Sequence, residues 1–587
     1  MTPAPPPTAE PRQLTARAVV AGMAIGAVLC ASNVYVVLKT GWSLGVTLSS
    51  TIIAFGLFRA LRAARLVRHP LGVLENTTVS SVASAAAFMT GGGNMAALPA
   101  LVMLTGQRPA AAALALWFGA IAALGVFAAI PIKRRILDTE GVPFPLGVAT
   151  ATTLRAMHGT PDGGRTAGKL YAAAAAAGVF TLLRDLRSLP AHIPAALGLP
   201  FSIAGHPARA WSFGLDASLV LVGGGALMGP RTAWSMLLGA VATYGVLAPA
   251  LVQGGAIAAV DYKAIVAFTA WPGAAMLVSA SVTSLAFQWR GAFETLRSLV
   301  SLRPPAAARS EDEAADEAPS RWFALGVAAL APLVVWMLAR FFGVPVWAGL
   351  LSIPLALVMG VVAGRVTGET DISPTKALGP VTQLIYGALL PANLTANLMS
   401  ANVTGGVGLH TGDLLTDLKV GQLVGASPRR QVIAQLFGVA VGALAVVPAF
   451  ALLVPDAAAL GTPELPAPAV MVWASVSKAL AGGLAGLPHA VRVAIAIGGA
   501  LGAGLAALER WLPARLQPWV PSAAGMGMAM VIPASTSIAM FAGSLMASGV
   551  RRARPAAAAS LVPIASGLVA GESVVGMALA VGRALGG

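Results

Sequence analysis

Two carboxylates stand out in this sequence because each lies in a long stretch that is otherwise uncharged: Glu75 and Glu572. A carboxylate at the centre of a membrane helix costs about 2.5–3.5 kcal/mol, which is usually tolerated where the group faces a cavity or a partner. Burial also favours the protonated form of a carboxylate. We therefore expect Glu75 or Glu572 to carry the coupling proton. A structural ion pair for Glu75 and a structural hydrogen bond for Glu572 are the alternatives.

A third candidate proton carrier is Asp413, in the polar segment Gly412–Lys419. Asp413 and Asp417 are four residues apart, so in a helix they share one face. An ordinary solvated turn is the alternative for this segment.

Amide side chains form a second chemically active group. Asn393 and Asn397 share one helical face, and Asn402 adds a third amide to the same apolar segment. We expect these amides to hydrogen-bond a peptide or a chelate, and hydrogen bonding between helices is the alternative.

Glycine clusters predict where the helices are interrupted. A break exposes backbone N–H groups that can bind a substrate carboxylate, and Asn94 can cap the helix that follows the first cluster. A kink or close helix packing is the alternative for that cluster. The expected breaks are Gly91, Gly92 and Gly93 before Asn94, and Thr404, Gly405 and Gly406 further along.

The first apolar run ends in polar residues. Asn33 and Tyr35 lie inside it and Lys39 closes it. We expect these three, together with Asn76, to contact substrate. Anchoring of the helix end at the membrane surface by Lys39 and Trp42 is the alternative.

Composition excludes several classes of protein. Of the 587 residues, 57% are hydrophobic and 10% are charged, against about 25% charged in soluble chains. The net charge of +16 comes mostly from short basic clusters between apolar runs, which is typical of cytoplasmic loops and predicts no nucleic-acid partner. The one cysteine, Cys30, and six unpaired histidines predict no metal site.

The chain also lacks a credible nucleotide site. Gly163–Leu170 resembles a phosphate-binding loop but has Leu170 where magnesium needs a hydroxyl, and an apolar run follows it. We therefore expect no ATP and no cofactor, with a proton gradient as the energy source.

The apolar runs predict an all-α polytopic membrane protein of about 16 transmembrane helices. Segments 143–157 and 466–485 are short and bounded by proline, which predicts re-entrant helices. The expected parts are a disordered cytosolic tail (1–15), an N-terminal transmembrane repeat (16–289), a polar cytosolic linker (290–320) and a C-terminal transmembrane repeat (321–587).

The two repeats are expected from weak matches that keep their order at slowly drifting offsets. We expect parallel repeats. Lys133–Arg135 would then correspond to the acidic Asp456 region, a mismatch that inverted repeats would remove. The matches are Trp117–Gly119 with Leu436–Gly438, Gly91–Gly92 with Gly405–Gly406, Pro145 with Pro466, and Gly229–Pro230 with Ile532–Pro533.

Several of these segments resemble signatures of the oligopeptide transporter (OPT) superfamily. They are Asn33–Trp42, Glu75–Asn76, Asp371–Lys376, Thr411–Lys419 and Ala570–Ser573. The resemblance implies a secondary transporter, largely proton-coupled, with about 16 helices that arose by internal duplication. It implies small peptides, glutathione-like thiols or metal chelates as substrates. The NPG and KIPPR motifs of the peptide-transporting branch are absent, so the chain is more similar to the prokaryotic and yellow stripe-like side.

We therefore expect a proton symporter in a bacterial-type inner membrane, and not an enzyme. Its interrupted helices and buried acids would meet in a pocket halfway through the lipid, and alternating access would move the substrate. The expected partners are the small-molecule or peptide substrate, the lipid bilayer and a second copy in a homodimer. A passive channel is the alternative, followed by a membrane-embedded enzyme.

Overall fold

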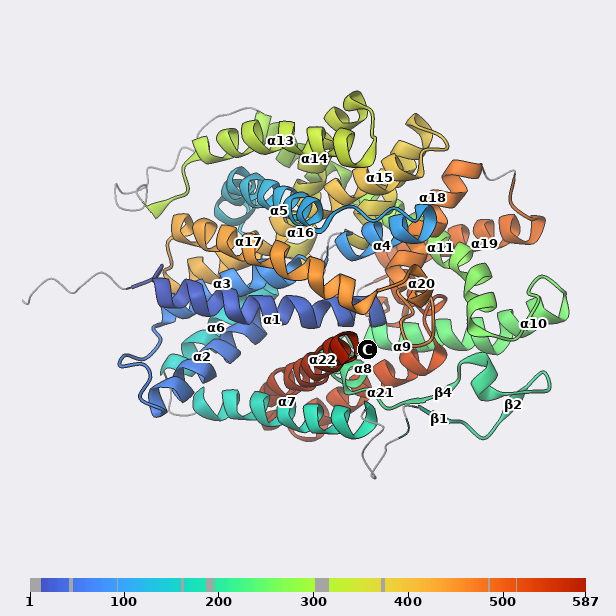
Figure 1. Cartoon of the computed structure of the whole chain (residues 1–587), viewed down its shortest axis with the longest axis horizontal. Helices are drawn as coiled ribbons and strands as arrows, with labels where there is room; N and C mark the ends of the chain where they lie inside the picture. The colour runs from blue at the N-terminus through green and yellow to red at the C-terminus, as the bar shows by residue number, and fades with distance from the viewer. Residues whose placement is uncertain are drawn as a thin grey trace, which may run out of the picture.

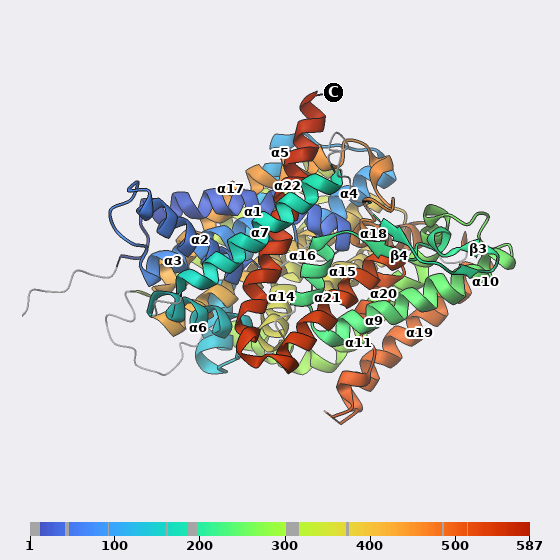
Figure 2. The same ribbon diagram turned by 90° about the horizontal axis from the view of Figure 1, so that it is seen from below.

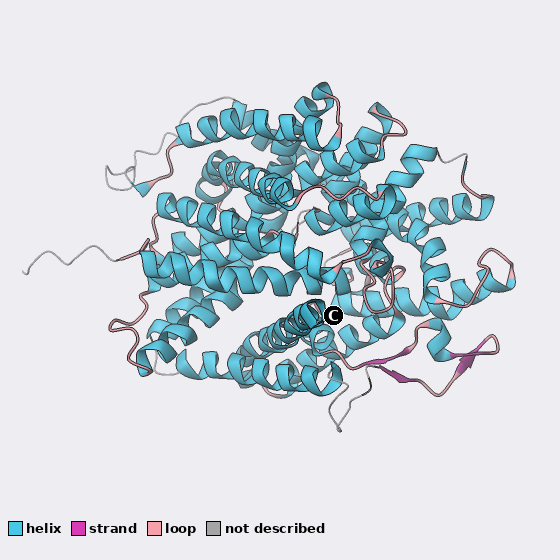
Figure 3. Ribbon diagram, in the orientation of Figure 1, coloured by secondary structure: helices cyan, strands magenta, loops and turns pink. Residues whose placement is uncertain are grey.

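The structure is a computed structural model that describes residues 12–41, 46–91, 93–159, 163–185, 194, 196–300, 316–370, 375–483, 486–513 and 515–586. Most of the expected tail (1–11) and linker (301–315) lies outside these ranges. Trp42, Gly92 and residues 371–374 also lie outside them. The described chain is almost entirely helical, with short strands gathered at one corner (Figure 3).

The first part of the chain runs from α1 to α11, with the short strands between α7 and α8 (Figure 1). β1 pairs with β4 and β2 with β3, both antiparallel. A π-helical stretch continues α5 and another joins α9 to α10. The elements are α1 (Ala16–Thr40), α2 (Thr47–Ala63), α3 (Val73–Phe88), α4 (Asn94–Thr105), α5 (Ala111–Lys133), η1 (Arg134–Thr139), α6 (Pro145–Gly159), α7 (Gly163–Asp185), β1 (Ala196–Gly198), β2 (Ser202–Ile203), β3 (His206–Pro207), β4 (Gly214–Asp216), α8 (Leu219–Leu227), α9 (Pro230–Ala240), η3 (Val241–Leu247), α10 (Ala248–Gln253) and α11 (Tyr262–Val300).

The second part runs from α13 to α22. Its helices are α13 (Ser320–Phe342), α14 (Val346–Thr370), α15 (Thr375–Leu389), α16 (Leu394–Val424), α17 (Pro428–Leu453), α18 (Pro468–Gly482), α19 (His489–Trp511), α20 (Ala523–Ala529), α21 (Ala534–Ala553) and α22 (Leu561–Gly586).

The chain is an all-α, multi-pass membrane protein. Within the described ranges, ten helical segments are long and apolar enough to cross a bilayer, so the expected count of about 16 is not reached by this criterion. The other expected spans form shorter helices or, as in α16, carry many polar side chains that the protein itself buries. The ten are Ala16–Thr40, Ala111–Thr139, Arg165–Asp185, Pro230–Gln253, Tyr262–Ser284, Ser320–Phe342, Val346–Gly368, Pro428–Leu453, His489–Trp511 and Pro555–Gly576.

The chain segment before α1 and the chain segment before α13 lie at the same end of the molecule. We call this end the N-terminal face. Gln13 exchanges two hydrogen bonds with the backbone of Ser427, at 2.8 and 3.2 Å, and the Ser427 hydroxyl donates to the Asp316 carbonyl at 3.1 Å. Lys133 lies 2.5 Å from Glu317. The starts of α1, α13 and α17 and the end of α5 therefore lie together.

The opposite face is fixed by contacts with the loop that follows α17. The N–H of Ala467 donates to the Leu38 carbonyl at 2.7 Å, and Arg108 donates to the Val454 carbonyl at 3.4 Å. The end of α1, the start of α5 and the end of α17 therefore lie at this face. It follows that α5 and α17 cross the molecule in opposite senses.

The same set of packing relationships occurs twice. α1 packs on α3 as α14 packs on α16, and α2 packs on α3 as α15 packs on α16. α3 packs on α17 as α16 packs on α5, and α6 packs on α16 as α18 packs on α4. Finally, α7 packs along α22 and α19 along α11 (Figure 2). Among the helices that the structure describes, α13 has no equivalent in this scheme.

Glycines allow the closest of these approaches, because no side chain separates the two backbones. A Cβ on Gly571 would lie 2.1 Å from the carbonyl oxygen of Ala174 between α22 and α7. A Cβ on Gly502 would lie 2.2 Å from that of Met276 between α19 and α11.

Two expectations about helix breaks have different outcomes. α3 and α4 are separate helices around Gly93, whose positive φ of 86° favours glycine. The break expected at Thr404–Gly406 is wrong, because α16 is one continuous helix of 31 residues. Segment Gly412–Lys419 also lies inside α16 and is not a loop. The 15-residue helix α6 overlaps the expected short segment 143–157 and ends two residues beyond it, and the 15-residue helix α18 lies within the expected segment 466–485.

A candidate substrate and coupling site

The residues around the α3–α4 break form a directional chain of hydrogen bonds. The indole N–H of Trp117 donates to Oδ1 of Asn402 at 2.8 Å, and Nδ2 of Asn402 donates to Oδ1 of Asn94 at 2.7 Å. Asn94 in turn donates to the Met89 carbonyl at 2.7 Å. All of the side chains are buried. The chain joins α5, α16 and the break, so the expected association of Asn94 with Asn402 is present.

Close packing explains the glycines at this junction. A Cβ on Gly93 would lie 2.4 Å from the ring of Trp473, and one on Gly406 would lie 2.4 Å from Ile121. Gly91 donates its N–H to the Phe88 carbonyl and accepts from the Asn94 N–H, both at 2.9 Å. Its backbone groups are therefore used within the turn in this conformation.

Asn33 approaches the same break from α1. Its Nδ2 donates to the Ala87 carbonyl at 3.3 Å and to the Thr90 hydroxyl at 3.0 Å. A small cavity of about 40 Å³, partly open to the surface, lies beside Asn33 between α1, α2, α8 and α22. Ser32, Ser49 and Ser566 supply its hydroxyl groups.

Asn397 lies near the start of α16, toward the opposite face. Its Nδ2 donates to the Gln383 carbonyl of α15 at 2.6 Å, and its Oδ1 accepts from the Gln383 side chain and from Ser477 of α18, at 3.0 and 2.7 Å. Asn397 therefore ties α16 to α15 and to the short helix α18.

Asn76 makes equivalent ties near the N-terminal face. Its Nδ2 donates to the Thr51 carbonyl of α2 at 3.2 Å and lies 3.2 Å from Nε2 of His158 in the short helix α6. α2 and α6 hold the positions here that α15 and α18 hold around Asn397.

Two further predicted residues make local contacts. Asn393 caps α16, its Oδ1 accepting from the Ala396 N–H at 2.9 Å. Thr404 shares a hydrogen bond of 2.7 Å with the Thr382 hydroxyl, and Gly405 is buried within the same helix.

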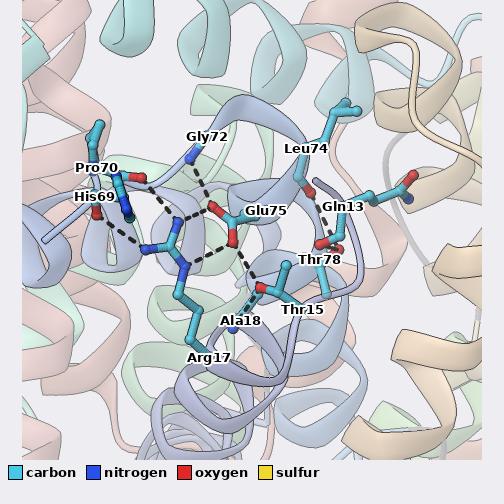
Figure 4. A network of polar contacts seen from close by, with 10 residues as sticks. All are labelled: Gln13, Thr15, Arg17, Ala18, His69, Pro70, Gly72, Leu74, Glu75 and Thr78. Carbon is cyan, nitrogen blue, oxygen red and sulfur yellow. Dashed lines mark hydrogen bonds and ion pairs between the residues drawn. The ribbon is translucent and has the colours of Figure 1, made fainter. Parts of the chain in front are cut away.

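Glu75 lies at the start of α3 in a nearly complete set of donors (Figure 4). It accepts from Nε of Arg17 at 2.8 Å, from the Thr15 hydroxyl at 2.7 Å and from the Gly72 N–H at 3.2 Å. A second guanidinium nitrogen of Arg17 also contacts it, and Arg17 donates to the carbonyls of His69 and Pro70. The partner of this carboxylate is therefore an arginine of α1.

Glu572 is also paired with an arginine. One oxygen accepts from Arg184 at 2.8 Å and from the Ser218 hydroxyl at 2.9 Å, and the other accepts from the Val220 N–H at 2.9 Å. Lys39 is an electrostatic neighbour of Glu572 and lies 5.8 Å from the ring centre of Tyr35, a cation–π distance.

These contacts separate the two glutamates. Arg17, which holds Glu75, is in the first turn of α1, whereas Lys39 is in its last turn. At 1.5 Å per residue the two turns are about 33 Å apart. Glu75 and Glu572 therefore do not meet in a common pocket.

Asp413 has a different environment. Its Oδ1 accepts from the Ser84 hydroxyl of α3, and its Oδ2 accepts from Nε2 of Gln435 of α17 at 3.1 Å. The same Gln435 nitrogen donates to Oδ2 of Asp417 at 2.8 Å. Both carboxylates are buried, and in the described part of the chain neither forms an ion pair with a basic side chain.

Sequence reasoning missed several residues that complete these clusters. Gln431 and Gln435 are polar residues four apart in an apolar helix, so the amide spacing that singled out Asn393 and Asn397 would also have indicated them. The remaining residues that were not predicted are Trp117, His158, Gln383, Asp417 and Ser477.

Comparisons with known proteins place the chain in a family. The family model described as OPT oligopeptide transporter protein matches residues 13–582. A protein of Saccharomyces cerevisiae that carries the name of an oligopeptide transporter is 24% identical, covering 96% of this chain and 95% of that protein.

Two plant relatives have more specific names. A metal–nicotianamine transporter of Oryza sativa subsp. japonica is 24% identical, covering 97% of this chain and 92% of its own length. The iron–phytosiderophore transporter yellow stripe 1 of Zea mays is 24% identical, covering 96% and 89%. The match to the family model extends over nearly the whole chain, and the chain therefore belongs to the OPT oligopeptide transporter family, whose members are transporters and not enzymes.

Proposed function

We propose that this chain is a secondary active transporter that couples a proton gradient to the movement of small peptides or metal chelates by alternating access. Family membership and the named cargoes of the relatives support this substrate range. The observation that carries the mechanism is the repeated packing scheme, in which equivalent helices cross the molecule in opposite senses.

The scheme supports inverted repeats, α1–α11 and α14–α22, instead of the parallel repeats expected from the sequence. α5 runs from the opposite face to the N-terminal face and α17 runs in reverse. Equivalent helices also match in length: α1 and α14 have 25 residues each, and α7 and α19 have 23. Inverted repeats can exchange conformations, so that the state open to one side becomes the state open to the other.

Asn76 and Asn397 then take equivalent places in the two repeats. Each ties its own helix, α3 or α16, to a neighbour and to a 15-residue helix, α6 near the N-terminal face and α18 toward the opposite face. We assign α6 and α18 as the two gates, with Asn76 and Asn397 as the ties that close them. Only one tie has to break in each half of the cycle.

The substrate region is proposed at the α3–α4 break. Asn33, Asn94 and Asn402 converge there, and release of their internal bonds would free amide groups for a peptide or chelate. Gly93 and Gly406 leave room at the same place for the side chains of Trp473 and Ile121. Tyr35 and Lys39 lie further along α1, toward the opposite face, and are proposed to guide an anionic substrate toward the break.

Asp413 is the coupling residue that the contacts favour. Glu75 and Glu572 are each compensated by an arginine, so they can remain ionised throughout the cycle. Asp413 lacks such a partner in the described chain and lies in α16, the helix that also carries Asn397 and Asn402. Proton binding there would act on the helix that contacts both the substrate region and a gate.

The membrane orientation follows from charge. The basic residues Lys133, Arg134, Arg135, Arg429 and Arg430 belong to the N-terminal face, so we assign that face to the cytoplasm. We place the protein in a bacterial-type inner membrane, and a homodimer remains part of the proposal because of the apolar surface.

Reconstitution tests the proposed function. Proteoliposomes would be given labelled ferrous nicotianamine or a labelled tetrapeptide, with and without an inward proton gradient. Gradient-dependent accumulation of either probe above the external concentration supports the proposal. Equilibration without accumulation, and without exchange of preloaded for external probe in a counterflow assay, would assign a channel instead.

A further inference from the structure

Asp413 and Asp417 are joined by one amide group. Nε2 of Gln435 donates to Oδ2 of both residues, at 3.1 and 2.8 Å, so the two oxygens lie no farther apart than the sum of these distances. An amide nitrogen has two hydrogens, one for each carboxylate. The two aspartates of α16 are therefore held together by Gln435 of α17.

The surroundings do not compensate two negative charges. α3 contributes the hydroxyl of Ser84, which donates to Asp413. On α17, Gln431 donates to the Asp417 carbonyl at 2.7 Å and makes no bond to either carboxylate. Two ionised carboxylates this close in a low-dielectric interior repel each other strongly, and one proton between them removes most of that cost.

Other charged groups on the packed helices are engaged elsewhere. Glu75 of α3 is held by Arg17 and Arg365 of α14 by Glu140. The basic residues of α17, Arg429 and Arg430, are at its first turn, and Lys419 of α16 is directed to Gln422. On the other side of the pair along α16, the next titratable group is His410, about one turn before Asp413.

Unpaired hydrogen-bond acceptors near Asp413 and Asp417 are a separate indication that one of the two carboxyl groups is protonated. Oε1 of Gln435 is fully buried and has no donor in the described part of the chain, although its amide nitrogen points into the pair. Oε1 of Gln431 likewise has no donor there. A cluster rich in acceptors and poor in donors is completed by a protonated carboxyl, which supplies one O–H.

We propose that Asp413 and Asp417 form a single binding site for one proton, shared between them and positioned by Gln435. The site holds one carboxyl and one carboxylate when loaded, and two carboxylates after the proton leaves to water. Gln435 is a positioning residue, since its two N–H groups stabilise the charged partner and keep the two oxygens together. This inference deepens the proposed function by naming the coupling ion's site and its stoichiometry.

The experiment counts protons and needs no substrate. Purified full-length protein in detergent micelles, without buffer, would be moved from about pH 7 to about pH 10, and a pH-indicator dye would report the protons released per molecule. Asp413→Asn/Asp417→Asn is the reference, because release from all other groups cancels in the difference. We expect a difference of one proton.

A difference of two would mean that both groups are protonated, and a difference of zero would mean that both are ionised. Either result overturns the shared site. The jump would be repeated with sodium and with choline as the salt cation. A count that depends on sodium would assign the site to a metal cation and overturn the proton assignment.

Gln435 offers a variant with a matched control. Gln435→Leu removes both N–H donors from the pair, and without them a charged member is no longer favoured, so we expect the count to rise to two. Gln431→Leu, one turn away, removes an amide that bonds only the Asp417 backbone, and the count should stay at one. Equal counts in the two leucine variants would exclude the positioning role.

Two further measurements keep the test valid if a variant misfolds, and they separate failure of the proton site from failure of the proposed transport function. Infrared spectroscopy of the unmodified protein should show a protonated carboxyl band that is lost at alkaline pH, which tests the site even if the asparagine variants fail to fold. Absence of that band contradicts the proposal. Failure of both probes to accumulate in proteoliposomes would count against the proposed function alone, because the proton count does not depend on a substrate.

Discussion

Asn76 and Asn397 make the same pair of ties at different ends of the molecule: each donates its amide to a backbone carbonyl of one helix and contacts a side chain of a 15-residue helix. The equivalence joins residues that are far apart in sequence, and it follows the repeated packing of α2, α3 and α6 and of α15, α16 and α18. Because the two asparagines lie at different ends, a substitution of each one tests the helix at its own end separately.

The first prediction concerns the two gates. Asn76→Ala should open α6 and Asn397→Ala should open α18, because each loses hydrogen bonds worth roughly 1–3 kcal/mol together. A cysteine introduced at Met157 of α6 should react with a maleimide roughly 10-fold faster in Asn76→Ala than in the otherwise unmodified protein. A cysteine introduced at Val476 of α18 should show the same acceleration in Asn397→Ala.

The two reporters act as controls for each other. Met157 and Val476 are both buried, and the native Cys30 is fully buried, so it should stay unlabelled. Acceleration of both reporters by either alanine variant would indicate general loosening and would contradict independent gates.

The second prediction concerns the pair of Arg184 and Glu572. Arg184→Leu leaves a buried carboxylate without its cation, which costs about 3–5 kcal/mol. We expect a large fall in the thermal midpoint, partly restored in Arg184→Leu/Glu572→Gln. A double variant that is less stable than the single one would show that the carboxylate does not depend on the arginine.

The third prediction concerns Gly93. Its φ of 86° already disfavours a side chain, and a Cβ would meet Trp473 at 2.4 Å. Gly425 has a similar φ of 79° but open space around it, so Gly425→Ala tests conformational strain alone, of about 1 kcal/mol.

Gly93→Ala should therefore lower thermal stability clearly more than Gly425→Ala. The smaller side chain in Gly93→Ala/Trp473→Leu should recover part of the loss. Equal effects of the two alanine substitutions would mean that contact with Trp473 does not limit the turn.

The fourth prediction separates structural from coupling carboxylates. Glu75→Gln and Glu572→Gln should keep gradient-driven accumulation while losing stability, because their partners are arginines. Asp413→Asn should remain folded and abolish the gradient dependence, with at least a 10-fold lower accumulation ratio, since the proposed shared site loses one of its two carboxylates. Uptake of labelled probe in proteoliposomes and thermal midpoints measure both effects, and the opposite pattern would restore the glutamates as proton carriers.

Local sequence patterns predict part of this structure well. Long apolar runs are sufficient to predict an all-α membrane protein, because the bilayer leaves few alternatives. The run Gly91–Gly93 before Asn94 predicts the α3–α4 interruption, since glycine permits the positive φ. The cap expected from Asn94 is wrong, because Gly93 is the N-cap of α4 and the Asn94 amide donates to the Met89 carbonyl. The proline-bounded short helices α6 and α18 are predictable for similar reasons.

Features set by distant contacts are not predictable in this way. Gly405–Gly406 has the same local composition as a break, yet Gly406 serves a close contact with Ile121 and α16 continues through it. Segment Gly412–Lys419 is polar because Ser84 and Gln435 surround Asp413, and neither partner is visible from the segment itself. The arginines that hold Glu75 and Glu572 are likewise supplied by other helices.

α13 (Ser320–Phe342) stands outside the repeated packing, and this position has a topological consequence. Its start shares the N-terminal face with the start of α1, and its end meets Trp117 of α5 near the other side. In the proposed arrangement of two inverted repeats, this one additional crossing reverses the direction in which the second repeat enters the membrane. Each proposed repeat can then take up the conformation that the other held before.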